Sequence, residues 1–192
     1  MQLKFSISVV AIVALGIAGL AGSSLSGLSN AQSPYVTQLD SPVRGLDAQE
    51  VDDLLNGRGA GYALTAELNS YPGPRHVLDL NRELALSSEQ EQQIEVIFRQ
   101  MDAEAKRIGQ QIVELEQQFS NSFAQGTVSE SEIEEKTQQL ALLYGQYRAI
   151  HLQPHLEVQR LLSAEQIAKY DELRGYSNSP IQSTPNSPAH HH

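Results

Sequence analysis

The sequence predicts an all-α protein, built around a long antiparallel helical hairpin with shorter flanking helices. Two long stretches repeat apolar residues in alternating steps of about four and three, which is the spacing of a helical packing seam. Residues 125–127 separate these stretches, so the two helices must fold back on each other to bury their seams. The absence of tryptophan and an aromatic content of 6% leave little material for a large globular core.

The composition excludes several classes of function. The 192 residues suffice for one domain. With 13 Lys and Arg against 23 Asp and Glu, the net charge is −10, which argues against a nucleic-acid partner. There are no cysteines, so disulfides, thiolate metal sites and cysteine nucleophiles are excluded. The sequence also lacks a Gly-x-Ser-x-Gly elbow and a phosphate-binding loop, so we expect neither enzyme activity nor a required cofactor.

Residues 1–31 are predicted to be a secretory signal peptide. Residues 1–4 carry one lysine, residues 5–20 are apolar apart from two serines, and Ala31 ends a stretch typical of a cleavage site. An uncleaved anchor helix is the alternative, because the apolar run is near the lower length limit for a membrane span. Cleavage would leave a periplasmic chain with a net charge of −11 and no stable membrane insertion, since the removed segment holds one basic and no acidic residue.

Residues 32–73 are expected to form an N-terminal extension with short helices. Asp47 and Glu50 have the spacing of a capping box, which would open a helix that runs through Leu55. Residues 62–68 have room for another helical turn or two. The sequence leaves open whether this extension packs on its own subunit or reaches a partner.

Residues 74–176 are expected to form the main helical domain. Pro74 suits the first position of a helix that extends to Leu84. The first long helix is predicted over about residues 88–123, ended by Gly126. Its seam consists of Ile94, Ile97, Phe98, Met101, Ala105, Ile108, Ile112, Leu115 and Phe119.

The second long helix is predicted to begin at a capping box formed by Ser129 and Glu132. A last short helix spans about residues 164–173. Residues 177–192 form a Ser-, Pro- and His-containing tail that we expect to be disordered, and its final His190–His192 is native or an appended tag. The seam of the second helix consists of Ile133, Thr137, Leu140, Tyr144, Tyr147, His151, His155, Val158 and Leu162.

A Leu-Ser-x-Glu-Gln pentapeptide occurs twice, at residues 86–90 and 162–166. In each copy the serine hydroxyl can accept a hydrogen bond from the third helical N–H, and the glutamine can reach back to the serine N–H. The leucine is placed for a hydrophobic staple. Each copy therefore predicts a capped helix start worth about 1 kcal/mol. The motif residues are Leu86, Ser87, Gln90, Leu162, Ser163 and Gln166.

The repeated pentapeptide resembles the Leu-Thr-x-x-Gln signature of the Spy/CpxP family of periplasmic stress proteins. Serine replaces threonine in both copies and keeps the capping hydroxyl. The resemblance covers about residues 74–176, and residues 66–78 and 170–176 are similar to a branch described as periplasmic heavy-metal sensors or resistance proteins. The resemblance implies a four-helix, cradle-like subunit that pairs into an antiparallel homodimer. It also implies ATP-independent chaperoning of unfolded clients, or metal sensing upstream of an envelope-stress regulator.

Three histidines are candidate metal ligands: His76, His151 and His155. The last two are four residues apart and therefore share one face of a helix, on its apolar seam. Pro154 lies between them and is expected to bend the helix and open a pocket. If the hairpin turns at Gly126, residues whose numbers add to about 254 face each other.

Asp79 and Glu83 could add oxygen ligands, and Met101 a thioether for Cu(I). This set of residue types suits Zn, Cu or Ni. Two other interpretations stay open. The seam histidines are buried interface residues hydrogen-bonded to Gln or Glu, or they titrate near neutral pH and form a pH-responsive interface. The sequence thus leaves two functions, a chaperone-like protein and a metal sensor or sequestering protein.

Overall fold

The structure, a computed structural model, describes residues 33–177. The predicted signal peptide and nearly all of the predicted tail lie outside these residues. The described part consists of helices and turns without any strand, so the all-α prediction is confirmed. None of the helices in residues 33–177 combines the length and apolar character that a membrane span needs.

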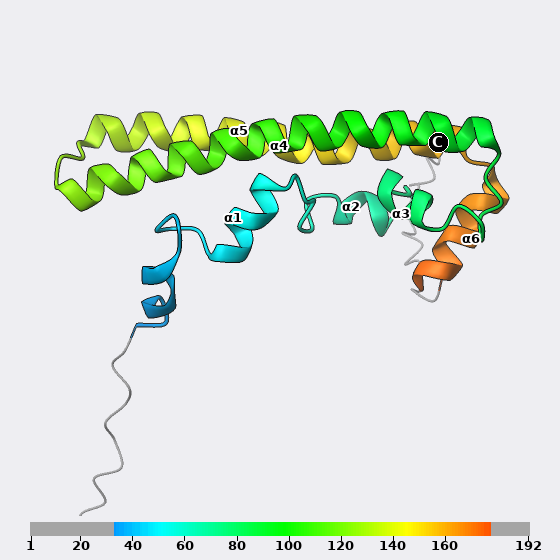
Figure 1. Cartoon of the computed structure of the whole chain (residues 1–192), viewed down its shortest axis with the longest axis horizontal. Coiled ribbons are helices and arrows are strands. Elements are labelled where there is room, and N and C mark those ends of the chain that lie inside the picture. Colours follow the sequence, from blue (N-terminus) through cyan, green and yellow to red (C-terminus); the bar gives the residue numbers. More distant parts are fainter. Residues whose placement is uncertain (1–32, 178–192) are drawn as a thin grey trace, which may run out of the picture. The chain divides into compact units, whose positions relative to one another are not determined.

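A long helical hairpin carries the shorter α-helices on one side (Figure 1). The predicted N-terminal extension packs on the hairpin of its own chain. In order, the elements are a 3-10 helix η1 (Val36–Asp40), α1 (Ala48–Leu55), α2 (Leu64–Glu67), α3 (Pro74–Asp79), α4 (Ser88–Gln125), α5 (Glu130–Leu161) and α6 (Ala164–Arg174).

The turn between α4 and α5 sets the register of the hairpin. Gly126 ends α4 with a φ of 67°, a left-handed conformation that glycine adopts without a Cβ penalty. Across the turn, Ser122 Oγ donates to Glu132 Oε1 at 2.6 Å, and Lys136 Nζ donates to Gln118 Oε1 at 3.5 Å. The residue numbers of both pairs add to 254, which confirms the predicted register.

The capping box predicted at the start of α5 forms only in part. Ser129 Oγ accepts from the Glu132 N–H at 3.2 Å, as predicted. The Glu132 carboxylate does not return to the Ser129 N–H, because it accepts from Ser122 across the turn instead. A tertiary hydrogen bond has displaced the local one.

Two separate core clusters lie along the hairpin. The first packs the segment around α1 against α4 and α5, and it includes Val51, Leu54, Ala105, Ile108 and Tyr147. Leu54 comes so close that a Cβ at Gly109 would lie 1.9 Å from its carbonyl oxygen, so only glycine fits there. The second cluster lies near the pentapeptides and comprises Val77, Leu84, Ile94, Val158, Leu162 and Tyr170.

The helix predicted over residues 74–84 is shorter than expected, because α3 ends at Asp79. Leu80 leaves the helical conformation with a φ of −106° and a ψ of 19°, and turns follow as far as Ala85, whose φ is 48°. These turns bring Leu84, which is 3% exposed, into the same core cluster as Tyr170. Core packing has therefore outweighed the helical spacing of the apolar residues.

Both pentapeptides form complete capping boxes, as predicted. The two glutamines also bind each other: Gln90 Nε2 donates to Gln166 Oε1 at 2.9 Å, and Gln166 Nε2 donates to Gln90 Oε1 at 3.1 Å. Each amide nitrogen donates a second time across the fold, Gln90 to the Leu161 carbonyl at 2.7 Å and Gln166 to the Leu84 carbonyl at 3.2 Å. The start of α4 is thereby joined directly to the start of α6.

We predict that Gln90→Ala lowers the free energy of unfolding by about 1–3 kcal/mol, because it removes a cap and leaves partners of the paired amides unsatisfied. Gln166→Ala should cost a similar amount, and the double variant should show a coupling of about 0.5–3 kcal/mol. Urea denaturation measures these changes. Gln93→Ala is the control, since Gln93 is exposed and bonds only to Glu89 at 3.4 Å. Additive effects of Gln90→Ala and Gln166→Ala would contradict the paired arrangement.

Candidate functional site

The three candidate histidines line one cavity of about 450 Å³. Residues 56–76 form one wall, α4 and α5 form the opposite wall, and Arg174 and Tyr176 lie at its C-terminal edge. His151 and His155 come from α5, and His76 comes from α3. We call this the histidine cavity.

His155 is 5% exposed and held in one orientation. Its Nδ1 lies 2.7 Å from the Tyr71 carbonyl oxygen, which can only accept, so Nδ1 carries the proton and donates. In the neutral tautomer that this bond selects, Nε2 has the lone pair that a metal ligand needs. Pro154 beside it is buried inside α5, and the helix continues through it.

His151 is 3% exposed, and its Nε2 is buried without a hydrogen-bond partner in the described part of the chain. Its ring packs edge-on against Tyr147, with centroids 4.8 Å apart. Burial, together with the nearby His155, lowers the pKa of His151 to about 4, so the ring is neutral at pH 7. Both seam histidines are buried, as that interpretation expects, but within residues 33–177 neither bonds to a Gln or Glu side chain, and His155 bonds to a backbone carbonyl instead.

His76 occupies a more open position. Its side chain is 41% exposed, and its Nδ1 lies 3.8 Å from Asp79 Oδ2. Partial burial and the charge of Arg174 lower the pKa of His76. Asp79 and Met101 line the same cavity, whereas Glu83 does not.

Glu67 was not among the predicted ligands, yet it is a buried carboxylate in the histidine cavity. It accepts from the Gly73 N–H at 3.2 Å and from the Tyr170 hydroxyl at 2.7 Å, which ties α2 to α6. A Cβ at Gly73 would lie 2.7 Å from Glu67 Oε1 and 2.9 Å from His155 Cε1. The chain therefore requires glycine there to pass between the carboxylate and the imidazole.

The histidines share a cavity but do not form a preformed metal centre. Within residues 33–177, no three His, Asp or Glu side chains are grouped closely enough to hold an ion. Binding through all three histidines therefore needs a local movement of the exposed His76 ring toward α5. Their role as ligands stays a prediction.

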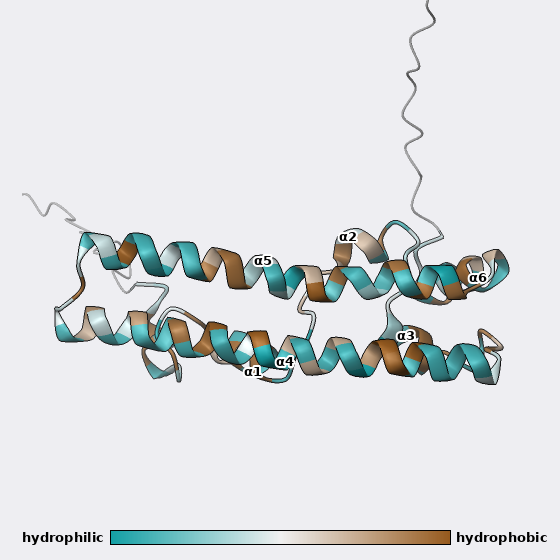
Figure 2. Cartoon of the chain, turned by 90° about the horizontal axis from the view of Figure 1, so that it is seen from above, coloured by the Kyte–Doolittle hydropathy of each residue, from teal (hydrophilic) through white to brown (hydrophobic). Residues whose placement is uncertain are grey.

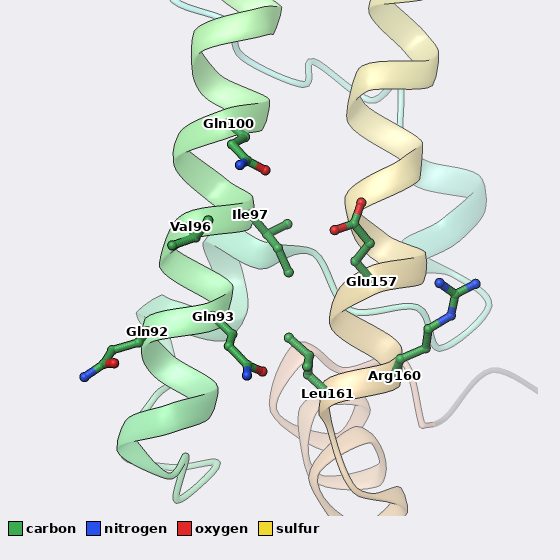
Figure 3. Close-up of a pocket in the computed structure, with 8 residues that line it drawn as sticks. All are labelled: Gln92, Gln93, Val96, Ile97, Gln100, Glu157, Arg160 and Leu161. Carbon is green, nitrogen blue, oxygen red and sulfur yellow. The ribbon is translucent and has the colours of Figure 1, made fainter.

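The opposite face of the hairpin is not covered by α1, α2, α3 or α6 (Figure 1). Seen from above, hydrophilic and hydrophobic residues alternate along both long helices (Figure 2). A groove of about 610 Å³ lies between α4 and α5 near the pentapeptides, with Ile97 and Leu161 pointing into the space between the helices (Figure 3). We call it the motif-end groove. The residues that line it are Gln92, Gln93, Val96, Ile97, Gln100, Glu157, Arg160 and Leu161.

A second groove, of about 340 Å³, repeats this arrangement near the turn. Every residue that lines it lies 18 positions along its own helix from a residue of the motif-end groove, as Leu115 does from Ile97. Eighteen residues make five helical turns, so the two grooves share one face, about 27 Å apart. The lining of this turn-end groove is Gln111, Glu114, Leu115, Gln118, Gln139, Leu142 and Leu143.

A family model described as "LTXXQ motif family protein" matches residues 74–174, which is 101 of the 192 residues. The chain belongs to the LTXXQ motif family. Neither the curated proteins nor the solved structures include a significant match. The family match spans both pentapeptides and begins at Pro74, the first residue of α3.

In this LTXXQ protein the motif glutamines have a structural role, since both are taken up by the hydrogen bonds that join α4 to α6. They lie outside the histidine cavity and the turn-end groove. The residues of the cavity and grooves are set by the hairpin register instead. The motif therefore identifies the family but does not indicate where the cavity and the grooves lie.

We predict that protonation of His151 destabilises the protein in mild acid. The unfolded chain binds this proton near pH 6.5, whereas the folded protein binds it only near pH 4. The free energy of unfolding is therefore unaffected by the titration of His151 above pH 6.5. It falls by a total on the order of 3 kcal/mol as the pH decreases from 6.5 to 4, because the unfolded chain takes up the proton first. Thermal unfolding between pH 7 and pH 4 should show a shallower dependence for His151→Phe. Equal slopes for the two proteins would contradict the prediction.

Proposed function

We propose that this LTXXQ protein is a non-enzymatic envelope-stress protein of the Spy/CpxP type, which acts in the periplasm as a homodimer. Its activity would be to bind unfolded protein segments without nucleotide. Membership of the LTXXQ family supports the general type. The observation that carries the proposal is the pair of aligned grooves on the uncovered face of the hairpin.

The grooves have the chemistry that binding of unfolded chains requires. Apolar side chains are exposed singly among glutamines, as with Val96 at 44% and Leu142 at 63% exposure. Such a surface binds apolar side chains weakly and reversibly, while the glutamine amides can bond to the backbone of a client. A separation of about 27 Å is spanned by about eight residues of extended chain. A short unfolded segment would therefore reach both grooves at once.

We predict that Val96→Lys combined with Leu142→Lys weakens chaperone activity severalfold, because each charge is costly to bury beneath an apolar client side chain. Light scattering of α-lactalbumin during reduction by dithiothreitol measures this, and the protein itself has no cysteine to be reduced. EDTA is present throughout. Leu173→Lys is the control, a similarly exposed leucine on α6 outside both grooves. Equal suppression of aggregation by all variants, or none by the wild type, would refute the proposal.

A second candidate function is metal sensing or sequestration through His76, His151 and His155, with Zn, Cu or Ni as the ion. The observation that favours it is the buried His151 Nε2, which has no partner among residues 33–177, in the same cavity as a His155 ring whose Nδ1 is bound to the Tyr71 carbonyl. Nitrogen ligands of this kind suit borderline metals, and Met101 in the same cavity would favour Cu(I). Binding would pull His76 inward and alter the surface offered to a regulator.

We predict that the protein binds about one Zn²⁺ or Cu ion per subunit, and that the double variant His151→Ala/His155→Ala loses this binding. Isothermal titration calorimetry measures the stoichiometry. The protein must lack His190–His192, because three further imidazoles would add a site. His76→Ala should weaken binding without abolishing it. Unchanged binding in the double variant, with its fold verified by circular dichroism, would exclude the histidine cavity as the metal site.

A further inference from the structure

A smaller cavity, of about 210 Å³, lies between α1 and α5 and is separate from both grooves. Three tyrosines line it: Tyr62, Tyr144 and Tyr147. Two carboxylates, of Glu50 and Asp53, complete most of its polar wall. We call it the tyrosine cavity. The functions proposed above make no use of it.

The aromatic wall is held in place by the fold. Tyr147 is fully buried, and its hydroxyl donates to the Arg58 carbonyl at 2.8 Å. Its ring meets that of Tyr62 edge to face, with centroids 5.3 Å apart and planes at 73°. Tyr144 lies three residues earlier on the same face of α5. Because the faces of aromatic rings carry negative potential, a set of rings around a small space attracts a cation.

The charges around the tyrosine cavity are not balanced. Glu116 on α4 does not line the cavity, but its charge acts on Tyr144, which does. It is half-buried and has neither an ion pair nor a hydrogen bond to any residue in the range 33–177. Burial and the charge of Glu50 raise the pKa of Glu116. Burial also raises the pKa of Tyr144, and the charges of Glu116 and Glu50 raise it further. A cation placed between these groups would relieve the repulsion.

The cations near the cavity do not supply this balance. Arg58, the positive group among the described lining residues, is already bound to Asp52 and, at 3.0 Å, to Asp53. Arg148 is exposed on α5. Its charge partly opposes the rise in the pKa of Tyr62 that burial causes. Among residues 33–177, the Glu50 carboxylate accepts only from the Asp47 N–H of its own helix cap, at 3.0 Å. The net charge left around the rings is therefore negative.

We propose that the tyrosine cavity binds a small quaternary ammonium compound. Several tyrosine rings lining one small cavity, together with the carboxylates of Glu50 and Asp53, supply the groups that recognise such cations. A metal ion fits less well, because no group of three His, Asp or Glu ligands exists within residues 33–177. The volume is below that of cavities for drug-sized ligands and suits a headgroup of choline size.

Calorimetric titration with choline chloride tests the proposal, against 3,3-dimethylbutan-1-ol, which has the same shape without the charge. We expect choline to bind at least about tenfold more tightly than the neutral analogue. Tyrosine fluorescence gives a second readout, since the chain has 7 tyrosines and no tryptophan. No binding of choline, or equal binding of the two compounds, would overturn the proposal.

Variants locate the binding within the molecule. Glu116→Gln and Tyr144→Leu should each weaken choline binding at least about tenfold, since one removes a charge and the other a ring face. Tyr144→Phe keeps the ring and should bind like the wild type. Glu114→Gln is the matched control, an exposed glutamate two residues from Glu116 that accepts from Gln110 at 2.8 Å. Retained binding in both Glu116→Gln and Tyr144→Leu, with both folded, would place choline elsewhere and overturn the proposal.

Discussion

The hydrogen bonds between Gln90 and Gln166 are the interaction on which the arrangement of the helices depends. Each amide completes its own helix cap, binds the other amide and donates to a backbone carbonyl of a distant segment. All the donors and the acceptor capacity of both side chains are thus used. Because amides that are partly withdrawn from water are costly to leave unpaired, the start of α4 and the start of α6 are held in one geometry.

This fixed end of the hairpin determines which surfaces are covered and which are open. With α6 turned under the hairpin, Tyr170 meets the Glu67 carboxylate, and Ser70 Oγ donates to Asp171 Oδ2 at 2.5 Å. The segment from Glu67 to Gly73 is thereby held against α6, while the His155 ring bonds to the Tyr71 carbonyl from α5. These contacts hold the short helices against one face of the hairpin. The two grooves on the other face remain exposed.

The two candidate functions concern opposite faces of the hairpin, and the buried histidines lie on the covered face. Both rings are buried, and within residues 33–177 the Nε2 of His151 has no hydrogen-bond partner, which costs stability unless the site uses that nitrogen. The grooves lie on the opposite face and share no lining residue with the histidine cavity. The proposed client binding and the proposed metal binding therefore involve different residues, and variants can test them separately.

The sequence by itself determined the helices, their caps and the hairpin register, because these follow from local spacing and from a single short turn. It also identified His76, His151 and His155, which the structure places around one cavity. Only the tertiary structure decided that Gln90 meets Gln166, that α3 stops at Asp79 and that Glu132 leaves its own cap. Each of these depends on partners 10 or more residues away, as between Ser122 and Glu132, whose approach no local pattern encodes. For the same reason the sequence did not predict the grooves or the tyrosine cavity, which form only where residues of different helices pack together.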